Sequence, residues 1–254
     1  MRKFLDIHYG EHEMQQLDLW LPEEESFDLF VYFHGGGIQS GCRKVDPSLP
    51  EYLTTRSVGL CSVEYRMFPE AKYPDFIRDC AASVAFIKEH IGEYGSCKRI
   101  FVGGSSAGGY LSMMLCFDKS WFAEVGVDPM DVAGYFHDAG QPTAHFNVLK
   151  YRGVDSRRII VDESAPLYHI GIEPEYPPMR LTVSDKDMAN RLEQTELVLS
   201  TLRHFGYDME KVSMDLRHGT HCHYTYPKQR NDKGESLFGE MIYEFVAWVD
   251  SLKS

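Results

Sequence analysis

Short apolar runs along the chain alternate with stretches in which apolar residues recur at helical spacing. The short runs are typical of buried strands, and the periodic stretches are typical of amphipathic helices. We therefore predict strands at 17–21, 29–33, 60–65, 99–102, 131–137, 178–183 and 212–216. Helices are predicted at 48–56, 76–91, 110–115, 191–205 and 241–252. This alternation indicates an α/β fold with a mostly parallel central sheet flanked by helices, the strand at 17–21 pairing antiparallel with the opening residues.

The segment from about 140 to 167 departs from the alternation. It is long and mixes polar residues with aromatic ones, among them His145 and Phe146. Long excursions in compact domains tend to be functional, and this one follows the end of a predicted strand. We interpret it as a short lid insertion, with His145 and Phe146 as candidate substrate contacts; a surface excursion that never touches substrate is the alternative. Residues 1–254 otherwise suit one domain with one core.

Composition narrows the class of protein. A net charge of -12 argues against nucleic acid as a partner, because phosphate binding depends on clustered Lys and Arg. No apolar run approaches the length of a membrane-spanning helix, so we expect no membrane partner and a cytoplasmic location. The six cysteines lie singly, without the paired spacing of a metal or redox centre, and we expect them reduced and mostly buried. Nothing in the composition indicates an oligomeric state.

A serine between glycines is the strongest chemical signal. The stretch 103–109 reads Gly-Gly-Ser-Ser-Ala-Gly-Gly, after an apolar strand and before a helical pattern. Glycines on both sides allow the strained strand-to-helix turn on which nucleophilic serines are presented. Centring Gly-x-Ser-x-Gly on Ser106 fits, whereas centring it on Ser105 places Ala107 where the second glycine belongs. We predict Ser106 as the nucleophile; a Gly/Ser-rich connecting loop is the alternative.

A second glycine motif, His34-Gly35-Gly36-Gly37, follows the predicted strand at 29–33. Backbone N–H groups without side chains nearby are what an oxyanion hole requires. We predict that Gly36 and Gly37, together with the N–H of Ala107 after the nucleophile, stabilise an oxyanion. Taken alone, the motif also fits a flexible turn or a phosphate-binding loop.

Together these motifs resemble an α/β-hydrolase of the carboxylesterase group related to hormone-sensitive lipase. The glycine loop begins early in this chain, which looks more like the compact bacterial esterases that cleave acetyl or cinnamoyl groups from plant polysaccharide fragments. The resemblance covers most of the sequence. It rests on 16–22, 34–37, the Glu-Tyr-Arg-Met-Phe-Pro-Glu segment at 64–70, Tyr73-Pro74, Asp79 and 104–109.

In this fold the acid and the base follow the serine in chain order. Asp185 and Asp187 follow the strand at 178–183. The family pattern of a glycine, two further residues and then the acid favours Asp187, with Ser184 in the glycine's place. Asp185 remains a rival, and either aspartate could simply cap a turn.

The base is expected after the last strand, in Arg217-His218-Gly219-Thr220-His221-Cys222-His223. We favour His221, with His223 as the runner-up and His218 behind it. Close spacing of His218, His221, Cys222 and His223 also resembles a metal cluster, but no second set of ligands stands out.

These residues predict hydrolysis of small carboxylic esters through an acyl-enzyme, with Ser106 as nucleophile, His221 as base and Asp187 as acid. The resemblance adds acetyl or feruloyl esters of plant-derived carbohydrate as substrates. We expect no cofactor and no metal. An amidase or peptidase on the same triad is an alternative, and so is a non-catalytic binding protein of the same fold.

Overall fold

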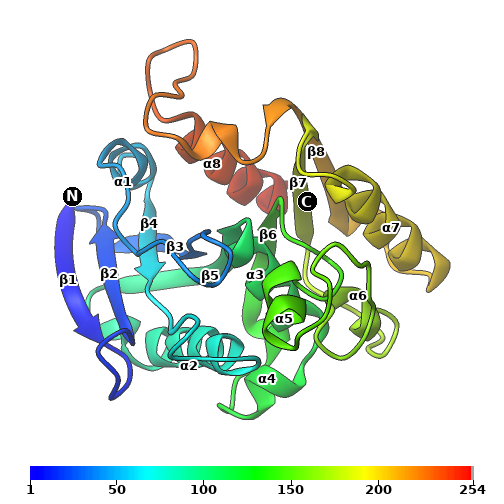
Figure 1. Ribbon diagram of the computed structural model, residues 1–254. Helices are drawn as coiled ribbons and strands as arrows, with labels where there is room; N and C mark the ends of the chain where they lie inside the picture. Colours follow the sequence, from blue (N-terminus) through cyan, green and yellow to red (C-terminus); the bar gives the residue numbers. More distant parts are fainter. Residues whose placement is uncertain (253–254) are drawn as a thin grey trace.

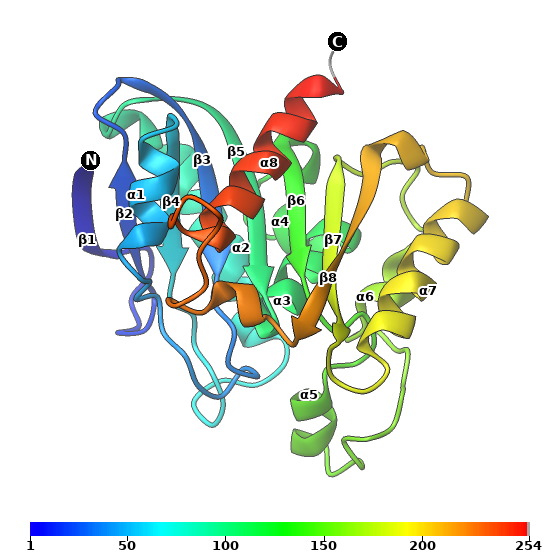
Figure 2. The same ribbon diagram turned by 90° about the horizontal axis from the view of Figure 1, so that it is seen from above.

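The computed structural model describes residues 1–252. Its centre is an eight-stranded sheet in the order β1-β2-β4-β3-β5-β6-β7-β8, with helices on both faces (Figures 1 and 2). Strand β2 runs antiparallel to both of its neighbours, and the remaining pairs are parallel. The strands are β1 (Arg2–His8), β2 (Gln16–Leu21), β3 (Ser26–Phe33), β4 (Val58–Val63), β5 (Ser96–Ser105), β6 (Val132–Asp138), β7 (Met179–Lys186) and β8 (Val212–Thr220).

The helices fill the connections that parallel strands require. They are α1 (Ser48–Thr54), α2 (Asp75–His90), α3 (Ala107–Phe117), α4 (Ser120–Ala123), α5 (Phe146–Tyr151), α6 (Pro166–His169), α7 (Arg191–His204) and α8 (Leu237–Ser251). Short 3₁₀ turns lie at Ile91–Glu93, Pro129–Asp131, Met209–Lys211 and His223–Thr225. None of the helices within residues 1–252 has the length and apolar character needed to span a bilayer.

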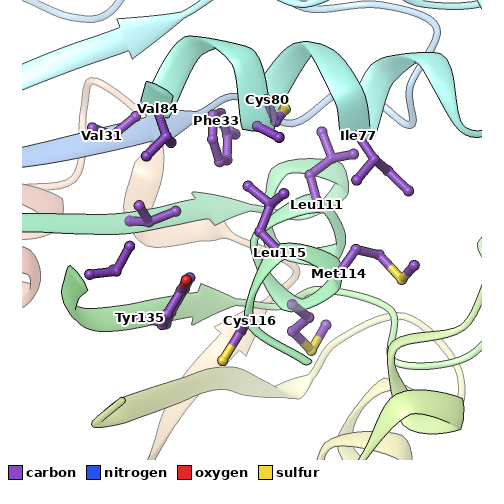
Figure 3. Close-up of a cluster of buried hydrophobic side chains, with 14 of the residues drawn as sticks. Val31, Phe33, Ile77, Cys80, Val84, Leu111, Met114, Leu115, Cys116 and Tyr135 are labelled. Carbon is purple, nitrogen blue, oxygen red and sulfur yellow. The ribbon is translucent and has the colours of Figure 1, made fainter. Parts of the chain in front are cut away.

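Two apolar cores cover the two faces of the sheet. On one face, α2 and α3 pack on β3 and β5, and Figure 3 shows Ile77, Leu111 and Phe33 meeting there. On the other face, α1 and α8 pack on Phe30, Phe101 and neighbouring side chains. The central strands are therefore buried on both sides, which explains their nearly continuous apolar runs.

The predicted α/β-hydrolase fold is confirmed, and the differences lie at element ends. Strand β8 continues to Thr220, because Thr220 pairs with Lys186 of β7, so His218 and Gly219 lie in the strand rather than in a loop after it. Strand β5 likewise extends from Ser96 to Ser105. Four of the six cysteines are buried, while Cys42 is exposed and Cys97 lies between.

Candidate active site

The candidate nucleophile lies at the sharp turn between β5 and α3. Ser106 has φ 56° and ψ −113°, in a region that L-residues rarely adopt. The turn depends on glycine, since a Cβ on Gly108 would lie 1.9 Å from the carbonyl oxygen of Phe33. A Cβ on Gly104 would lie 2.5 Å from the carbonyl carbon of Gly108. The glycines that the sequence singled out are therefore required by close backbone contacts.

The structure brings the three favoured side chains together. His221 Nε2 lies 2.8 Å from Ser106 Oγ, and His221 Nδ1 lies 2.6 Å from Asp187 Oδ1. Ser106 comes from the elbow, Asp187 follows β7 and His221 follows β8, so adjoining ends of the sheet deliver all three. In this arrangement Nδ1–H donates to the carboxylate and Nε2 accepts the serine proton, the tautomer that a general base needs.

The acid is shielded and ionised. The Asp187 side chain is 1% exposed, and its Oδ1 also accepts the N–H of Met188 at 2.7 Å. Burial alone raises the pKa of this carboxyl, but the hydrogen bond and charge of His221 outweigh it and lower the pKa below its usual value. Asp187 is therefore an anion at neutral pH, available to stabilise an imidazolium.

The rival residues lie elsewhere. Asp185 accepts from His218 Nδ1 at 2.6 Å, and that pair is largely exposed to solvent. His223 Nδ1 contacts the carbonyl oxygen of Thr220 at 2.9 Å, so its ring is used within its own turn. No group of three or more possible metal ligands gathers anywhere in the described part of the chain.

The glycine loop lies against the serine. Gly36 and Gly37 have φ of 119° and 65°, and a Cβ on Gly35 would lie 3.2 Å from the Cβ of Ser106. Within residues 1–252 the N–H groups of Gly36, Gly37 and Ala107 donate to no other protein group. These are donors available to a developing oxyanion beside Ser106.

Charged residues outside the predicted set support this loop. His34 Nε2 contacts Glu64 Oε1 at 2.9 Å, and Glu64 Oε2 accepts the N–H of Arg43 at 3.0 Å. The Tyr65 hydroxyl donates to the carbonyl oxygen of His34 at 2.7 Å, and the two rings stack. Glu64 belongs to the sequence motif at 64–70, but only the three-dimensional structure shows that it anchors the glycine loop.

A second support lies beneath the elbow and was missed in the sequence. The backbone oxygen of Asp138, the last residue of β6, accepts the N–H of Ser106 at 2.7 Å. Its buried side chain accepts the hydroxyl of Tyr224, three residues beyond His221. Burial raises the pKa of Asp138 to about 6. This one residue thus links the nucleophile elbow to the segment that carries the base.

The segment from 140 to 167 carries α5, which lies beyond the carboxyl ends of the parallel strands (Figure 2), and ends within α6. Asn147 Nδ2 donates to the carbonyl oxygen of Gly37 at 2.6 Å, and Tyr151 stacks on Phe68 with ring centroids 3.5 Å apart. The segment therefore rests on the glycine loop.

Of the two predicted substrate contacts, His145 is buried and accepts the N–H of Asn147 as the N-cap of α5. Phe146 is half-buried and faces Gly37, its ring 3.6 Å from where a Cβ of Gly37 would lie. Of the two, only Phe146 faces the glycine loop, whereas His145 is used within its own turn.

Sequence comparison places the chain near known esterases. The family model BD-FAE matches residues 17–124, which include both glycine motifs and end before the acid and the base. Carboxylesterase NlhH of Mycobacterium tuberculosis is 34% identical over 99 residues, covering 38% of this chain and 31% of NlhH. Human hormone-sensitive lipase is 31% identical over 102 residues, covering 38% of this chain and 10% of the lipase. The chain thus matches less than a third of the length of these relatives.

Structural similarity extends over the whole chain. A truncated carbohydrate esterase from gut microbiota has a TM-score of 0.78 at 15% identity, covering 98% of this chain and 97% of its own. Esterase B from Lactobacillus rhamnosis has a TM-score of 0.74 at 16% identity, covering 99% of this chain and 87% of its own. The comparisons confirm the resemblance that the sequence motifs indicated.

Proposed function

We propose that this chain, an α/β-hydrolase that resembles the esterases related to hormone-sensitive lipase, is a serine hydrolase that cleaves carboxylic esters. One observation carries the proposal: His221 lies 2.8 Å from Ser106 and 2.6 Å from Asp187, through opposite nitrogens of one ring. A nucleophile, a base and an orienting acid in hydrogen-bond reach are the elements of acyl transfer.

The reaction proceeds in two halves. Ser106 Oγ attacks the ester carbonyl while His221 Nε2 takes the serine proton, and Asp187 stabilises the imidazolium. The carbonyl oxygen becomes an oxyanion held by the N–H groups of Gly36, Gly37 and Ala107. His221 then gives its proton to the departing alcohol, which leaves an acyl group on Ser106. Water repeats the sequence, and the carboxylic acid is released.

The backbone donors account for a large share of the rate. A donor fixed at the oxyanion position contributes roughly 3 to 4 kcal/mol to transition-state stabilisation, because it needs no reorganisation during the reaction. The positive end of α3, whose first residue is Ala107, adds to the field at the same point. The chemistry therefore needs only this chain's own groups.

We further propose small acyl or cinnamoyl esters of plant-derived carbohydrate as substrates. Support comes from the similarity in fold to the gut-microbial carbohydrate esterase and to a bifunctional GH43-CE protein of Bacteroides eggerthii. The latter has a TM-score of 0.73 at 17% identity, covering 97% of this chain. Phe146, beside the glycine loop, offers an aromatic surface for the acyl group.

The test is hydrolysis of p-nitrophenyl acetate, p-nitrophenyl butyrate and methyl ferulate, with p-nitroacetanilide as the amide. Wild type should cleave esters, and Ser106→Ala should lose activity by at least about 10⁴-fold. Ser105→Ala is a matched control, because the neighbouring hydroxyl is buried in the strand and should be dispensable. Activity retained in Ser106→Ala, or cleavage of the anilide alone, would overturn the proposal.

A further inference from the structure

A cavity of about 290 Å³ lies between the 140–167 segment and the start of α7. Gln141, Phe146 and Arg158 line it from the segment, and Arg191 and Gln194 line it from α7. Polar side chains that converge on one apolar ring are typical of small-molecule sites. None of its lining residues moves a proton or holds the oxyanion in the proposed ester hydrolysis.

The charge of its wall is unusual for this protein. Three arginines line the cavity and, among the residues that the structure describes there, no Asp or Glu does. Arg157 is neutralised by Asp155 within its own turn. Arg158 and Arg191 form no ion pair within residues 1–252, although the whole chain carries a net charge of -12. An acidic protein thus presents a positive pocket.

Of the two arginines of the cavity wall without an ion pair among residues 1–252, Arg191 is buried whereas Arg158 is exposed. Arg191 is 5% exposed, and its Nη1 donates to the carbonyl oxygen of Ala139 at 2.9 Å. Burial lowers the pKa of Arg191 to about 10, which still leaves it charged at neutral pH. Burying a guanidinium without a direct ion pair is costly. The charge of the nearby Asp187 carboxylate offsets part of that cost, and a bound anion would offset more.

The cavity adjoins the reacting groups. Met188 lines the cavity and donates its N–H to Asp187, the acid of the site. Phe146 lines it as well, and its ring faces Gly37 of the oxyanion loop. Two of the lining residues of the cavity, Met188 and Phe146, therefore contact or face residues of the proposed catalytic site.

We propose that this cavity binds a carboxylate carried by the ester substrate, through the guanidinium groups of Arg158 and Arg191. The inference rests on the proposed ester hydrolysis and names the substrate class: anionic esters. Planar guanidinium groups match a carboxylate with paired, charge-assisted hydrogen bonds. The carboxylate belongs either to the acyl group, as in a dicarboxylic hemiester, or to the alcohol, as in an acylated uronate.

The test compares matched anionic and neutral esters. For the acyl side, mono-p-nitrophenyl glutarate is compared with p-nitrophenyl butyrate; for the alcohol side, 4-acetoxybenzoate is compared with its amide, 4-acetoxybenzamide. We expect kcat/KM to favour the anionic ester in one of the two pairs. Arg158→Gln should lower kcat/KM for that ester by roughly 10-fold or more, mostly through KM, while the neutral ester changes less than about twofold.

Controls separate this site from a general charge effect and from misfolding. Arg203→Gln removes the same charge at the exposed far end of α7 and should not change the preference. Arg191→Lys keeps the buried charge but loses the planar fork, and should weaken the preference while leaving the melting temperature close to wild type. Higher ionic strength should weaken the preference too.

Equal kcat/KM values within both ester pairs, or an unchanged preference in Arg158→Gln, would overturn the proposal while leaving ester hydrolysis intact. If no ester is cleaved, the proposed function fails, and the cavity is judged by calorimetry with glutarate. Binding to wild type and its loss in Arg158→Gln would support the carboxylate site on its own. No binding to wild type would overturn it.

Discussion

Ser106 and Asp187 lie near the same edge of one sheet, yet the fold holds them in different ways. The residues on either side of Ser106 are buried while Ser106 itself is partly exposed, and glycines in contact with neighbouring backbone determine the shape of the turn. The segments carrying Asp187 and His221 are partly exposed, and side-chain hydrogen bonds position them. The geometry of tightly packed backbone changes little with pH or with small substitutions next to it. The geometry of hydrogen-bonded side chains changes with both.

The largest effect is expected at His221, whose ring contacts both Ser106 and Asp187 and which we propose as the base. His221→Ala should lower kcat on the ester panel by about 10⁴-fold or more, because Ser106 loses its base. His218→Ala is the matched control, since that ring pairs with Asp185 in solvent and should change kcat less than about twofold. A large loss of kcat in His218→Ala with little change in His221→Ala would identify His218 as the base instead.

The substitution Gly108→Ala tests the close backbone contacts that shape the turn at Ser106. The added methyl would lie 1.9 Å from the carbonyl oxygen of Phe33, so the elbow must distort. We expect a loss of more than about 3 kcal/mol in the free energy of unfolding, measured by urea denaturation. Gly92→Ala is the control, because nothing lies within 4 Å of its added methyl. Equal stability of the two variants would contradict the steric account of the elbow.

The link between the two regions should depend on pH. The pKa of Asp138 is raised from 3.8 to about 6, so the folded state binds this proton more tightly than the unfolded state does. Its contribution to stability is complete below about pH 3 and is lost as the pH rises through 6. Between pH 3 and pH 7 wild type should lose about 3 kcal/mol relative to Asp138→Asn. Parallel curves of unfolding free energy against pH for the two proteins would contradict the proposed effect of Asp138 on stability.

The smallest effect is expected at the contact between the 140–167 segment and the glycine loop at 34–37. Asn147→Ala removes the hydrogen bond to the carbonyl oxygen of Gly37, worth about 1 kcal/mol. KM should rise several-fold with little change in melting temperature, because the loop remains held by Glu64 and Tyr65. A melting temperature lower by more than about 5 °C would show that Asn147 supports the fold rather than the site.

Much of the fold could be predicted because its signals are local. Buried parallel strands appear as apolar runs, and glycine clusters mark the points where backbones approach closely, as at 34–37 and 103–109. The end of β8 could not be predicted, because Arg217 to Thr220 read as a polar loop and join the strand only through pairing with β7. Register between distant strands has no local signal.

By itself, the sequence determined the α/β class, the position of the elbow and the short list of candidate acids and bases. Only the tertiary structure chose among them, placing Asp187 rather than Asp185 against His221. It alone revealed that Asp138 bonds both to Ser106 and to Tyr224, near His221, and that Arg158 and Arg191 line one cavity. The physical reason is the range of the interactions. Propensity and periodicity act between neighbours in the chain, whereas hydrogen bonds and charges act between side chains that folding brings together from distant positions.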